Sequence, residues 1–588
     1  MASTLISPGV LALENDNSFI TQQPITVGAA IIGPTVYGPA EVPTIVTSYS
    51  DYQNKFGTTF LSGSNVYTYF TSIAAFNYFN NGGESLLVAR VVTGSFTSAT
   101  TATGSVTGAN GGGVSILNTT GSEALTLNTI SQGIIMNSSG TLDSSGSLSA
   151  SGSANNIRWQ ITNNDSGSGT FALLIRQGDD NTNNPVVLET WTNLSMDPTA
   201  PNYVARVIGN QYKSFSIDGD GGSQIITNGD YPNNSKYVYI KTVNTPTPLY
   251  FDNNGNPKVQ YTGLLPANAS GSFIGATGTL FVGGNAAYYN NITSSVTNIQ
   301  GISASAYNNM ISLLANQDDY KFNILLTPGL CASEANLGAS QVTTIINNTQ
   351  NRGDNIYISD LVPFSSSINA VTSTANSKNT SYAASYWPWV QTIDPDSANL
   401  VWVPASTLVA GVYAYNDNVS EPWFAPAGIN RGGLSQVVRV EQKLSQSSRD
   451  TLYAGKVNPI ATFPGTGVVV YGQKTLQTRA SALDRVNVRR LLIALKSYIG
   501  QVANNLVFEQ NTIATRNQFL SQVNPYLTSV QQRQGLYAYK VIMDDSNNTP
   551  DVIDRNQLVG QIYLQPTKTA EFIYLNFNVT PTGATFPA

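Results

Sequence analysis

The first apolar pattern along the chain alternates strands with helices. Apolar runs at residues 25–32 and 85–92 predict two buried strands. Between them, apolar residues at close to helical spacing predict a helix over 66–79, and residues 50–56 predict a shorter helix that Gly57 ends. We therefore expect this region to form half of a compact α/β unit.

A second α/β pattern spans residues 301–361. Helices are expected at 302–315 and 341–350, and buried strands at 322–329 and 355–362. Two α/β halves therefore lie on either side of the middle of the chain, and whatever separates them is an insertion.

The middle of the chain has the pattern of short strands separated by turns. Residues 94–155 are rich in Ser, Thr and Gly, a composition that is compatible with disorder. Their repeated β-branched residues instead favour a surface β-domain. From 157 to 299, strands recur at the spacing of a β-domain, and we expect a β-dominated insertion of two lobes.

Charge is concentrated in one stretch, from Phe463 to Tyr498. Its apolar run at 468–471 predicts a strand, and Gly472 predicts a turn. Apolar residues spaced by three and four between 492 and 506 then predict one amphipathic helix. Before this stretch, an aromatic and proline-rich region at residues 382–426 predicts edge strands or rigid loops.

Two more helices and three strands are expected after it. Asn511 is expected to cap one helix, and Asn524-Pro525 is expected to begin another that ends at Gly535. The last strand alternates apolar and polar residues from 573 onward. The three closing strands are predicted at 536–543, 558–564 and 570–579.

The composition of the chain argues against several classes of function. Charged residues are only 11% of the 588 residues, against about 25% in typical soluble domains, and the net charge of −6 argues against broad nucleic-acid binding. The chain has no histidine, the commonest general base, and its single cysteine, Cys331, excludes an intrachain disulfide. Without a basic leader or a long apolar stretch, we expect a soluble protein made in the cytosol.

Several motifs imitate ligand sites but are better explained by local structure. Residues 467–475, GVVVYGQKT, nearly match a phosphate-binding loop, but an extra Gln displaces the Lys-Thr pair and the β-branched residues favour a strand. Asp218 and Asp252 begin Asp/Asn/Gly turns that lack the spacing of a calcium loop. Arg352-Gly-Asp354 and Asp544-Asp545 are also interpreted as turns. No catalytic residue, cofactor or metal is expected.

A cluster of basic residues remains, and two interpretations stay open: a solvated face or a docking surface. Positive charges in the first turn of a helix oppose the helix dipole. Either the helix starts earlier, with Ser481 or Asp484 as its cap, or an acidic partner compensates. The candidate tube- or neighbour-facing residues are Lys474, Arg479, Arg485, Arg489 and Arg490.

A series of short motifs in conserved order is similar to those of contractile bacteriophage tail sheath proteins, which are related to pyocin and type VI secretion sheaths. The motifs cover residues 7–92 and about 301–580, and residues 188–198 resemble a sheath middle domain. They are SPGV (7–10), GPxxxGP (33–39), FG (56–57), YWPW (386–389), VPAS (403–406), AGVYA (410–414), WxAPA (423–427), NPI (458–460), FPG (463–465), VYGQKTL (470–476), NVRRL (487–491) and AEFI (570–573).

This resemblance implies a structural protein without catalysis. Subunits of the family form stacked hexameric rings around a tail tube, are held extended in a metastable state, and contract to drive the tube through the host envelope. The implied partners are further copies of the chain, the tail tube, the baseplate and the tail terminator, within a virion assembled in the host cytoplasm. Terminal arms link neighbours by strand addition; here they comprise Val10, Leu11, Ala12, Leu13, Phe572, Ile573, Leu575, Phe577 and Val579.

The resemblance also implies an α+β multidomain fold, with an inner α/β assembly core built from both chain ends and inserted β-rich outer domains. A β-rich adhesin or receptor-binding tail component is the alternative, suggested by the Ser/Thr/Gly content. The expected domains are an N-terminal linking arm (1–24), the first part of the core (25–93), a variable outer insertion (94–155), a β-rich middle (156–300), the second part of the core (301–460), a C-terminal inner assembly domain (461–569) and a C-terminal strand and arm (570–588).

Overall fold

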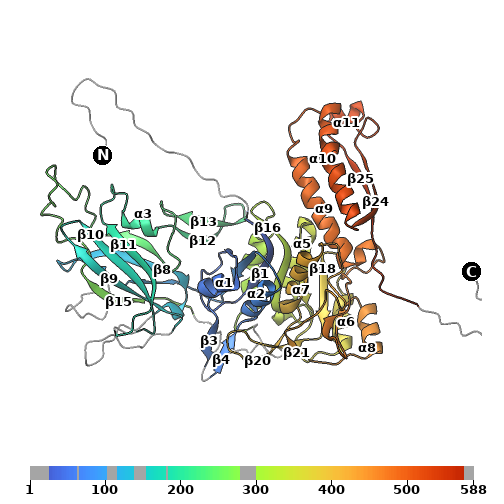
Figure 1. The fold of residues 1–588 in the computed structure, drawn as a ribbon, viewed down its shortest axis with the longest axis horizontal. Coiled ribbons are helices and arrows are strands. Elements are labelled where there is room, and N and C mark those ends of the chain that lie inside the picture. Colours follow the sequence, from blue (N-terminus) through green and yellow to red (C-terminus); the bar gives the residue numbers. More distant parts are fainter. Residues whose placement is uncertain are drawn as a thin grey trace, which may run out of the picture.

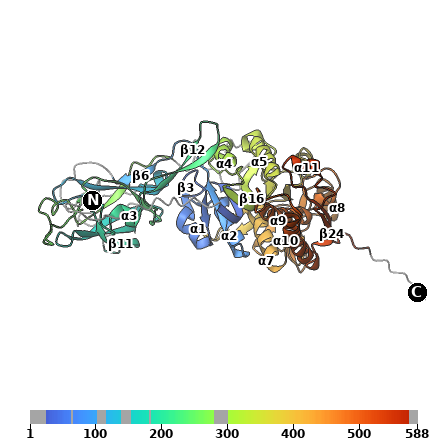
Figure 2. The same cartoon turned by 90° about the horizontal axis from the view of Figure 1, so that it is seen from above.

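The computed structural model describes residues 25–62, 65–101, 116–137, 154–180, 183–278 and 300–574. Figure 1 shows three parts in a row: a β-rich part in green and teal, a central part of mixed helices and strands, and a helical part in orange and red that projects from the centre. Seen from above, the same three parts form one elongated body (Figure 2). The expected mixture of helix and sheet is confirmed.

The central part is built on an eight-stranded sheet that draws strands from both halves of the chain. β1 pairs in parallel with β5 on one side and with β16 on the other, and β17 and β18 continue the parallel run. The strands, in sheet order, are β2 (Thr44–Val46), β5 (Leu86–Arg90), β1 (Ile25–Gly33), β16 (Tyr320–Cys331), β17 (Ile356–Asp360), β18 (Ala383–Trp387), β22 (Asn458–Phe463) and β23 (Gly467–Val470).

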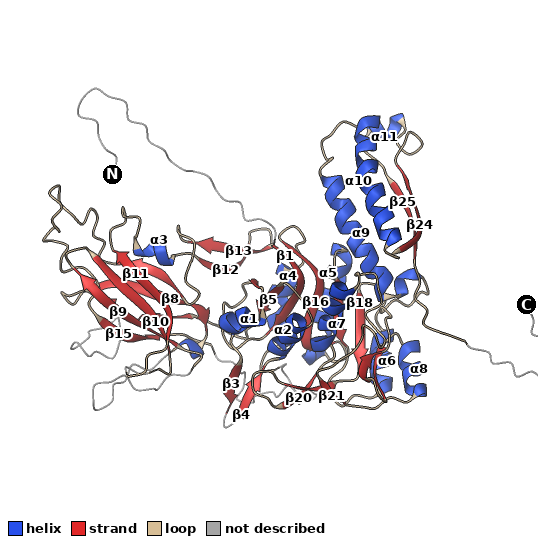
Figure 3. Cartoon of the chain, in the orientation of Figure 1, coloured by secondary structure: helices blue, strands red, loops and turns tan. Residues whose placement is uncertain are grey.

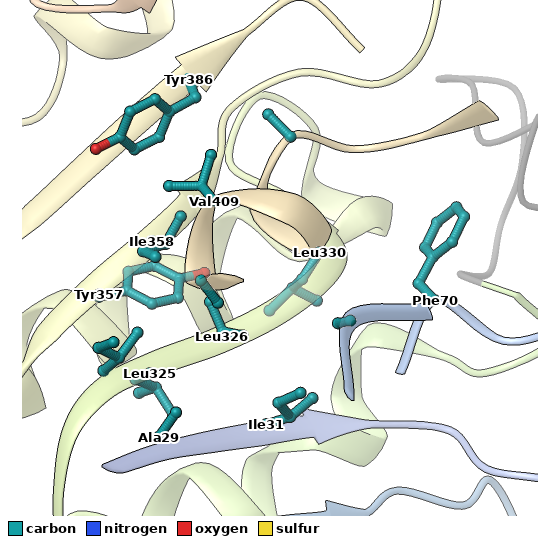
Figure 4. Packing of buried hydrophobic residues seen from close by; sticks show 14 of the residues in the cluster. Ala29, Ile31, Phe70, Leu325, Leu326, Leu330, Tyr357, Ile358, Tyr386 and Val409 are labelled. Atoms are coloured by element: carbon teal, nitrogen blue, oxygen red, sulfur yellow. The ribbon is translucent and has the colours of Figure 1, made fainter. Parts of the chain in front are cut away.

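Helices cover both faces of this sheet, as Figure 2 shows. One face carries α1 (Tyr49–Phe56), α2 (Phe70–Asn80) and α7 (Ser406–Val419), and α2 packs on α7. The other carries α4 (Asn308–Leu313) and α5 (Ala339–Arg352). The strands β5, β17 and β18 are buried along their whole length, as expected for a sheet covered on both faces. Figure 4 shows side chains of β1, β16 and β17 packed together beneath those of α7.

The prediction of edge strands or rigid loops throughout residues 382–426 is wrong for residues 406–419, which form helix α7. Ten of its fourteen residues are buried, so it has no polar face and gives no amphipathic signal. β18, from the same region, lies inside the sheet and not at its edge. Only β19 (Val390–Ile393), β20 (Leu400–Val403) and β21 (Val437–Val440) form a small separate sheet there.

The β-rich part is organised around a second eight-stranded sheet. Two strands from before residue 155, β6 and β8, lie between β15 and β14, which both come after it. Removing residues 94–155 would delete two strands from inside this sheet, so the boundary expected at 155 does not separate two folding units. The members are β6 (Ser98–Thr101), β7 (Ile116–Leu117), β8 (Glu123–Gln132), β9 (Ile157–Asp165), β10 (Thr170–Gln177), β11 (Val187–Ser195), β14 (Val238–Val243) and β15 (Ala269–Ile274).

The projecting C-terminal part has its own apolar core between two long helices and a two-stranded sheet. A single helix replaces the two predicted on either side of Asn524-Pro525. Phe519, Val523 and Leu527 form one buried stripe across the proline, and this burial outweighs the missing N–H of Pro525. The elements are α9 (Val486–Asn504), α10 (Ile513–Gln532), β24 (Leu536–Ile542), α11 (Pro550–Asp554) and β25 (Gln561–Pro566).

Smaller differences concern element ends. The helix predicted over 66–79 is β4 followed by α2, because residues 65–68 pair with β3 in a hairpin. The helix predicted over 302–315 is a 3₁₀ turn followed by the short α4. The remaining elements are β3 (Thr59–Ser62), β4 (Asn65–Thr68), α3 (Val204–Ile208), β12 (Tyr212–Ile217), β13 (Ser223–Asn228), α6 (Ile368–Asn376) and α8 (Gln446–Ala454).

Within the described ranges, no helix combines the length and the apolar character that crossing a bilayer requires. Figure 3 shows that helices dominate the projecting part, whereas strands dominate the part at the opposite end.

Candidate functional site

The C-terminal segment returns from the projecting part to the central part and is held there through Glu571. The Glu571 carboxylate accepts hydrogen bonds from Arg485 Nε at 2.7 Å, Tyr453 Oη at 2.7 Å and Gln473 Nε2 at 3.0 Å. Gln473 Nε2 also donates to Thr569 Oγ1 at 2.6 Å. We call Glu571 with Tyr453, Gln473 and Arg485 the anchor site.

The turn after β23 positions Gln473. Asn458 of β22 is fully buried and its side chain accepts from the Lys474 N–H at 2.6 Å, while it donates to the Lys474 carbonyl at 2.8 Å. Gly472 is required beside it, because a Cβ at that position would lie 2.9 Å from Asn458 Oδ1. The near-match to a phosphate-binding loop is therefore a strand and a tight turn fixed to the sheet.

Arg485 lies at the start of α9, next to this turn. The Val486 N–H donates to the Gln473 carbonyl at 2.8 Å, and the Thr475 N–H donates to the Asp484 carbonyl at 3.0 Å. The Arg485 side chain also pairs with Asp484 at 2.9 Å. The groups that hold Glu571 are thus tied to one another through the backbone.

The electrostatics of the anchor site favour an ionised carboxylate. Burial opposes ionisation of Glu571, but the bonds from Arg485, Tyr453 and Gln473 outweigh it and lower the pKa of the carboxyl below its ordinary value. Burial, together with the bond to Glu571, raises the pKa of Tyr453 well above its ordinary value, so this phenol stays a donor. The site therefore persists across the neutral pH range.

Three of the five predicted basic residues lie in or beside this site. Arg485 bonds Glu571 directly. Lys474 turns its ammonium group to the Tyr453 carbonyl at 2.8 Å and lies over the Tyr453 ring. Arg479, in the loop between them, has an exposed side chain. An acidic group from the C-terminal segment thus meets the basic cluster.

The other two basic residues, Arg489 and Arg490, are each only 4% exposed. Arg489 lies over the Tyr382 ring at 3.9 Å, and Arg490 pairs with Asp417 of α7 at 2.8 Å. Both alternatives for the positive charges are met in part: α9 begins at Val486, before both arginines, and Ser481 caps a separate 3₁₀ turn at Ala482–Asp484. Arg490 has its acidic partner, Asp417, within the same chain. A tube- or neighbour-facing role for these arginines stays a prediction.

The predicted arm residues fall at the edge of the described chain. Phe572 and Ile573 are 68% and 77% exposed, and residues 570–574 pair with no other strand among the described residues. Val10, Leu11, Ala12, Leu13, Leu575, Phe577 and Val579 lie outside the described residues.

Two surfaces close to this segment are open to a partner. β24 and β25 pair only with each other among the described strands, so each has a free edge. A groove of about 1000 Å³ lies between the segment, α10 and the central part. Its lining includes Trp423, Phe424, Arg431, Arg449, Tyr471 and Tyr537.

The motifs that imitate ligand sites have turn geometry. Asp218 Oδ1 accepts the backbone N–H groups of Asp220 and Gly222, as in an Asx turn. Asp544 does the same for Ser546. Arg352 pairs with Asp354 at 2.8 Å across a glycine that ends α5. The described residues contain no cluster of three or more potential metal-ligating side chains.

Sequence reasoning did not identify Glu571, Tyr453 or Gln473 as a site. The three are separated by 20 to 118 positions along the chain, which no local pattern connects. One signal was present: Glu571 is the single charge in an otherwise apolar AEFI motif.

Comparison with known proteins identifies both of the parts that meet at this site. Residues 300–476 match the phage tail sheath protein central domain, and residues 478–580 match the phage tail sheath C-terminal domain. The tail sheath protein of Vibrio phage KVP40 is 46% identical over 185 residues, and that of Enterobacteria phage T4 is 43% identical over 185 residues. Each match covers 32% of this chain and 28% of the relative's length.

The fold has a counterpart among solved structures. The crystal structure of a sheath tail protein from Listeria innocua superimposes with a TM-score of 0.51 at 10% identity, covering 92% of this chain and 95% of that chain. The family matches confirm the resemblance that the sequence motifs indicate over residues 300–476 and 478–580.

Proposed function

We propose that this chain, which carries the central and C-terminal domains of phage tail sheath proteins, is the structural subunit of a contractile tail sheath. The observation that carries the proposal is the contiguous match of 300–476 and 478–580 to these two domains. Copies of the chain form hexameric rings stacked around a tail tube. The rings are metastable when extended, and their contraction drives the tube through the host cell envelope.

Self-assembly by strand addition is supported by two features of the C-terminal part. β24 and β25 form a two-stranded sheet packed on α10, and a further strand at either free edge would pair backbone groups that the other described strands leave unpaired. The exposed Phe572-Ile573-Tyr574 supplies apolar side chains that its own chain leaves uncovered. In our proposal, residues 572–579 of one copy and 10–13 of another extend such a sheet.

The arrangement of the three parts supports an orientation. The projecting part and the β-rich part lie at opposite ends of the molecule (Figure 1). We place the projecting part, α9 to β25, toward the tube, the baseplate and the tail terminator. The β-rich sheet then faces outward, where it does not obstruct the packing of rings.

The proposal requires no catalysis and no nucleotide. Contraction releases energy stored during assembly, so the subunit acts through its contacts alone. The stretch that resembles a nucleotide loop supplies Gln473 to the anchor site instead. The place of action is the virion tail, assembled in the host cytoplasm.

Negative-stain electron microscopy of the purified chain tests the proposal. Hollow tubes with regular cross-striations are expected at high protein concentration. Slender trimeric fibres would instead support a β-rich adhesin, and a chain that stays monomeric under all assembly conditions would contradict the proposal.

A further inference from the structure

We propose that Glu571 is the positioning residue that fixes the C-terminal segment to the central sheet, so that a pull on the C-terminal arm is borne by the body of the subunit. The inference rests on the proposed function, because it assigns the anchor site a part in linking subunits. Beyond the proposed function, the inference names the residue, Glu571, and the contacts through which force on the arm reaches the central sheet.

The geometry of the anchor site makes Glu571 a junction of separate elements. Its carboxylate is bonded by Tyr453 of α8, by Gln473 after β23 and by Arg485 at the start of α9. Bonds to an ionised acceptor are stronger than neutral ones. The Glu571 side chain is 18% exposed, so solvent competes only weakly for these bonds.

The receiving groups are attached to the eight-stranded sheet. β23, which precedes Gln473, pairs with β22 along its length. Asn458 of β22 holds the Lys474 backbone on one side and donates to the Ser385 carbonyl of β18 at 3.1 Å on the other. A force on Glu571 therefore passes directly into three strands of the sheet.

Without Glu571, the load would follow a weaker path made of neutral hydrogen bonds. Gln473 Nε2 donates to Thr569 Oγ1 at 2.6 Å. Nearer to β25, the Thr567 side chain donates to the Gln534 carbonyl at 2.7 Å, and the Thr567 N–H donates to the Gly535 carbonyl at 3.2 Å. A pull would then act on these neutral bonds and on the end of β25, which pairs with one described strand, β24, in a two-stranded sheet. That sheet is also the one proposed to receive a neighbour's strand, so the same load would distort the receiving site.

The anchor site also marks where the docked segment ends. Glu571 is held by three partners, whereas Phe572, Ile573 and Tyr574 immediately after it are 68%, 77% and 87% exposed. Glu571 is held by hydrogen bonds, and the very next residue, Phe572, is already exposed. Glu571 therefore sets both the exit point of the arm and the length of chain available to reach a neighbour.

A mobility measurement on the unassembled full chain tests the anchor independently of sheath formation. Cys331 is buried, so a spin label at Ile573→Cys reacts selectively. Glu571→Ala is expected to shorten the rotational correlation time of this label at least threefold, and the isosteric Glu571→Gln is expected to shorten it less. The matched control is Lys568→Ala, an exposed position in the same segment, which is expected to leave the label unchanged. Equal mobility in Glu571→Ala and Lys568→Ala would overturn the proposal.

An assembly measurement then tests the load-bearing role. With folding verified by thermal melting, unlabelled Glu571→Ala is expected to raise the critical concentration for polymerisation at least tenfold, and Lys568→Ala is expected to polymerise like the unaltered chain. Polymerisation of Glu571→Ala at the unaltered concentration would refute the role in linking subunits. If the unaltered chain forms no polymer, the proposed function fails, and the mobility result still decides whether Glu571 is an anchor.

Discussion

Arg490 and Asp417 form an ion pair that joins the projecting part of the molecule to its centre. Arg490 is the fifth residue of α9, Asp417 lies near the end of α7, and the Nη1–Oδ1 distance is 2.8 Å. The guanidinium group also lies 4.8 Å from the centre of the Tyr413 ring. The pair therefore belongs to the internal structure of the subunit.

Reversing the charge of Arg490 is expected to lower the stability of the subunit itself, whether or not it also affects an interface. Arg490→Glu would bury a negative charge beside Asp417, whose side chain is 33% exposed, so we expect the low end of the about 3–5 kcal/mol that breaking a buried pair costs. The free energy of unfolding from urea titration should fall by that amount. Arg479→Glu, at an exposed position in the preceding loop, serves as the control and should stay within about 0.5 kcal/mol of the unaltered chain. Equal stability of the two variants would contradict the account.

Asp360 is expected to make stability depend on pH. Burial raises its pKa to about 6, although Ser406 and the Gly329 N–H donate to it. Because the folded chain holds this proton more tightly than the unfolded chain, the contribution is fully present below the unfolded pKa of about 4 and is lost as pH rises through about 6.

The loss is on the order of 3 kcal/mol for a shift of about two pKa units. The measurement is the free energy of unfolding of the unaltered chain minus that of Asp360→Asn, followed from pH 4 to 7. We expect this difference to decrease with rising pH. A difference that is flat, or that increases, would show that Asp360 does not titrate in this range.

Pro525 is expected to weaken α10. It sits at an exposed position inside the helix and cannot donate to the Ser521 carbonyl. Pro525→Ala restores the donor without opening a cavity, and about 1–3 kcal/mol of added stability is expected. Urea unfolding followed by circular dichroism measures it, and a destabilised variant would mean that the proline is needed for the geometry of the helix.

Replacing Gly472 or Gly500 by alanine is expected to change the stability of the chain in opposite directions. A Cβ at Gly472 would meet Asn458 Oδ1 at 2.9 Å and Pro459 Cδ at 3.0 Å, so Gly472→Ala should cost about 1–3 kcal/mol. A Cβ at Gly500 in α9 meets nothing within 4 Å, so Gly500→Ala should stabilise by up to about 1 kcal/mol. Thermal melting of both variants should therefore shift in opposite directions; a shift in the same direction would contradict the packing described around Gly472.

The spacing of apolar residues along the chain predicted helices that are buried on one face and strands that are apolar along their length. The strands at 322–329 and 355–362 appear as β16 and β17, and the helix at 341–350 appears as α5. α7 could not be predicted, because its first nine residues are all buried and carry no periodic signal. The continuity of α10 through Pro525 depended on tertiary packing, which overrides local turn signals.

The candidate site was predictable only as a concentration of charge. The basic cluster around Lys474 and Arg485 was visible in the sequence, but its partner Glu571 lies 86 positions beyond Arg485. Which arginines are exposed was not predictable either. Arg489 and Arg490 follow Arg485 by only four and five residues, yet they face the interior while Arg485 faces the C-terminal segment.

The central claim is that copies of this chain form a sheath by exchanging strands through the C-terminal segment. The most direct measurement is a cryo-electron microscopy reconstruction of the polymer formed by the purified chain. We predict six-fold rings in which residues 572–579 of one copy pair with β24 or β25 of another. A polymer in which these residues lie against their own chain, or in which β24 and β25 keep both edges free, would contradict the claim.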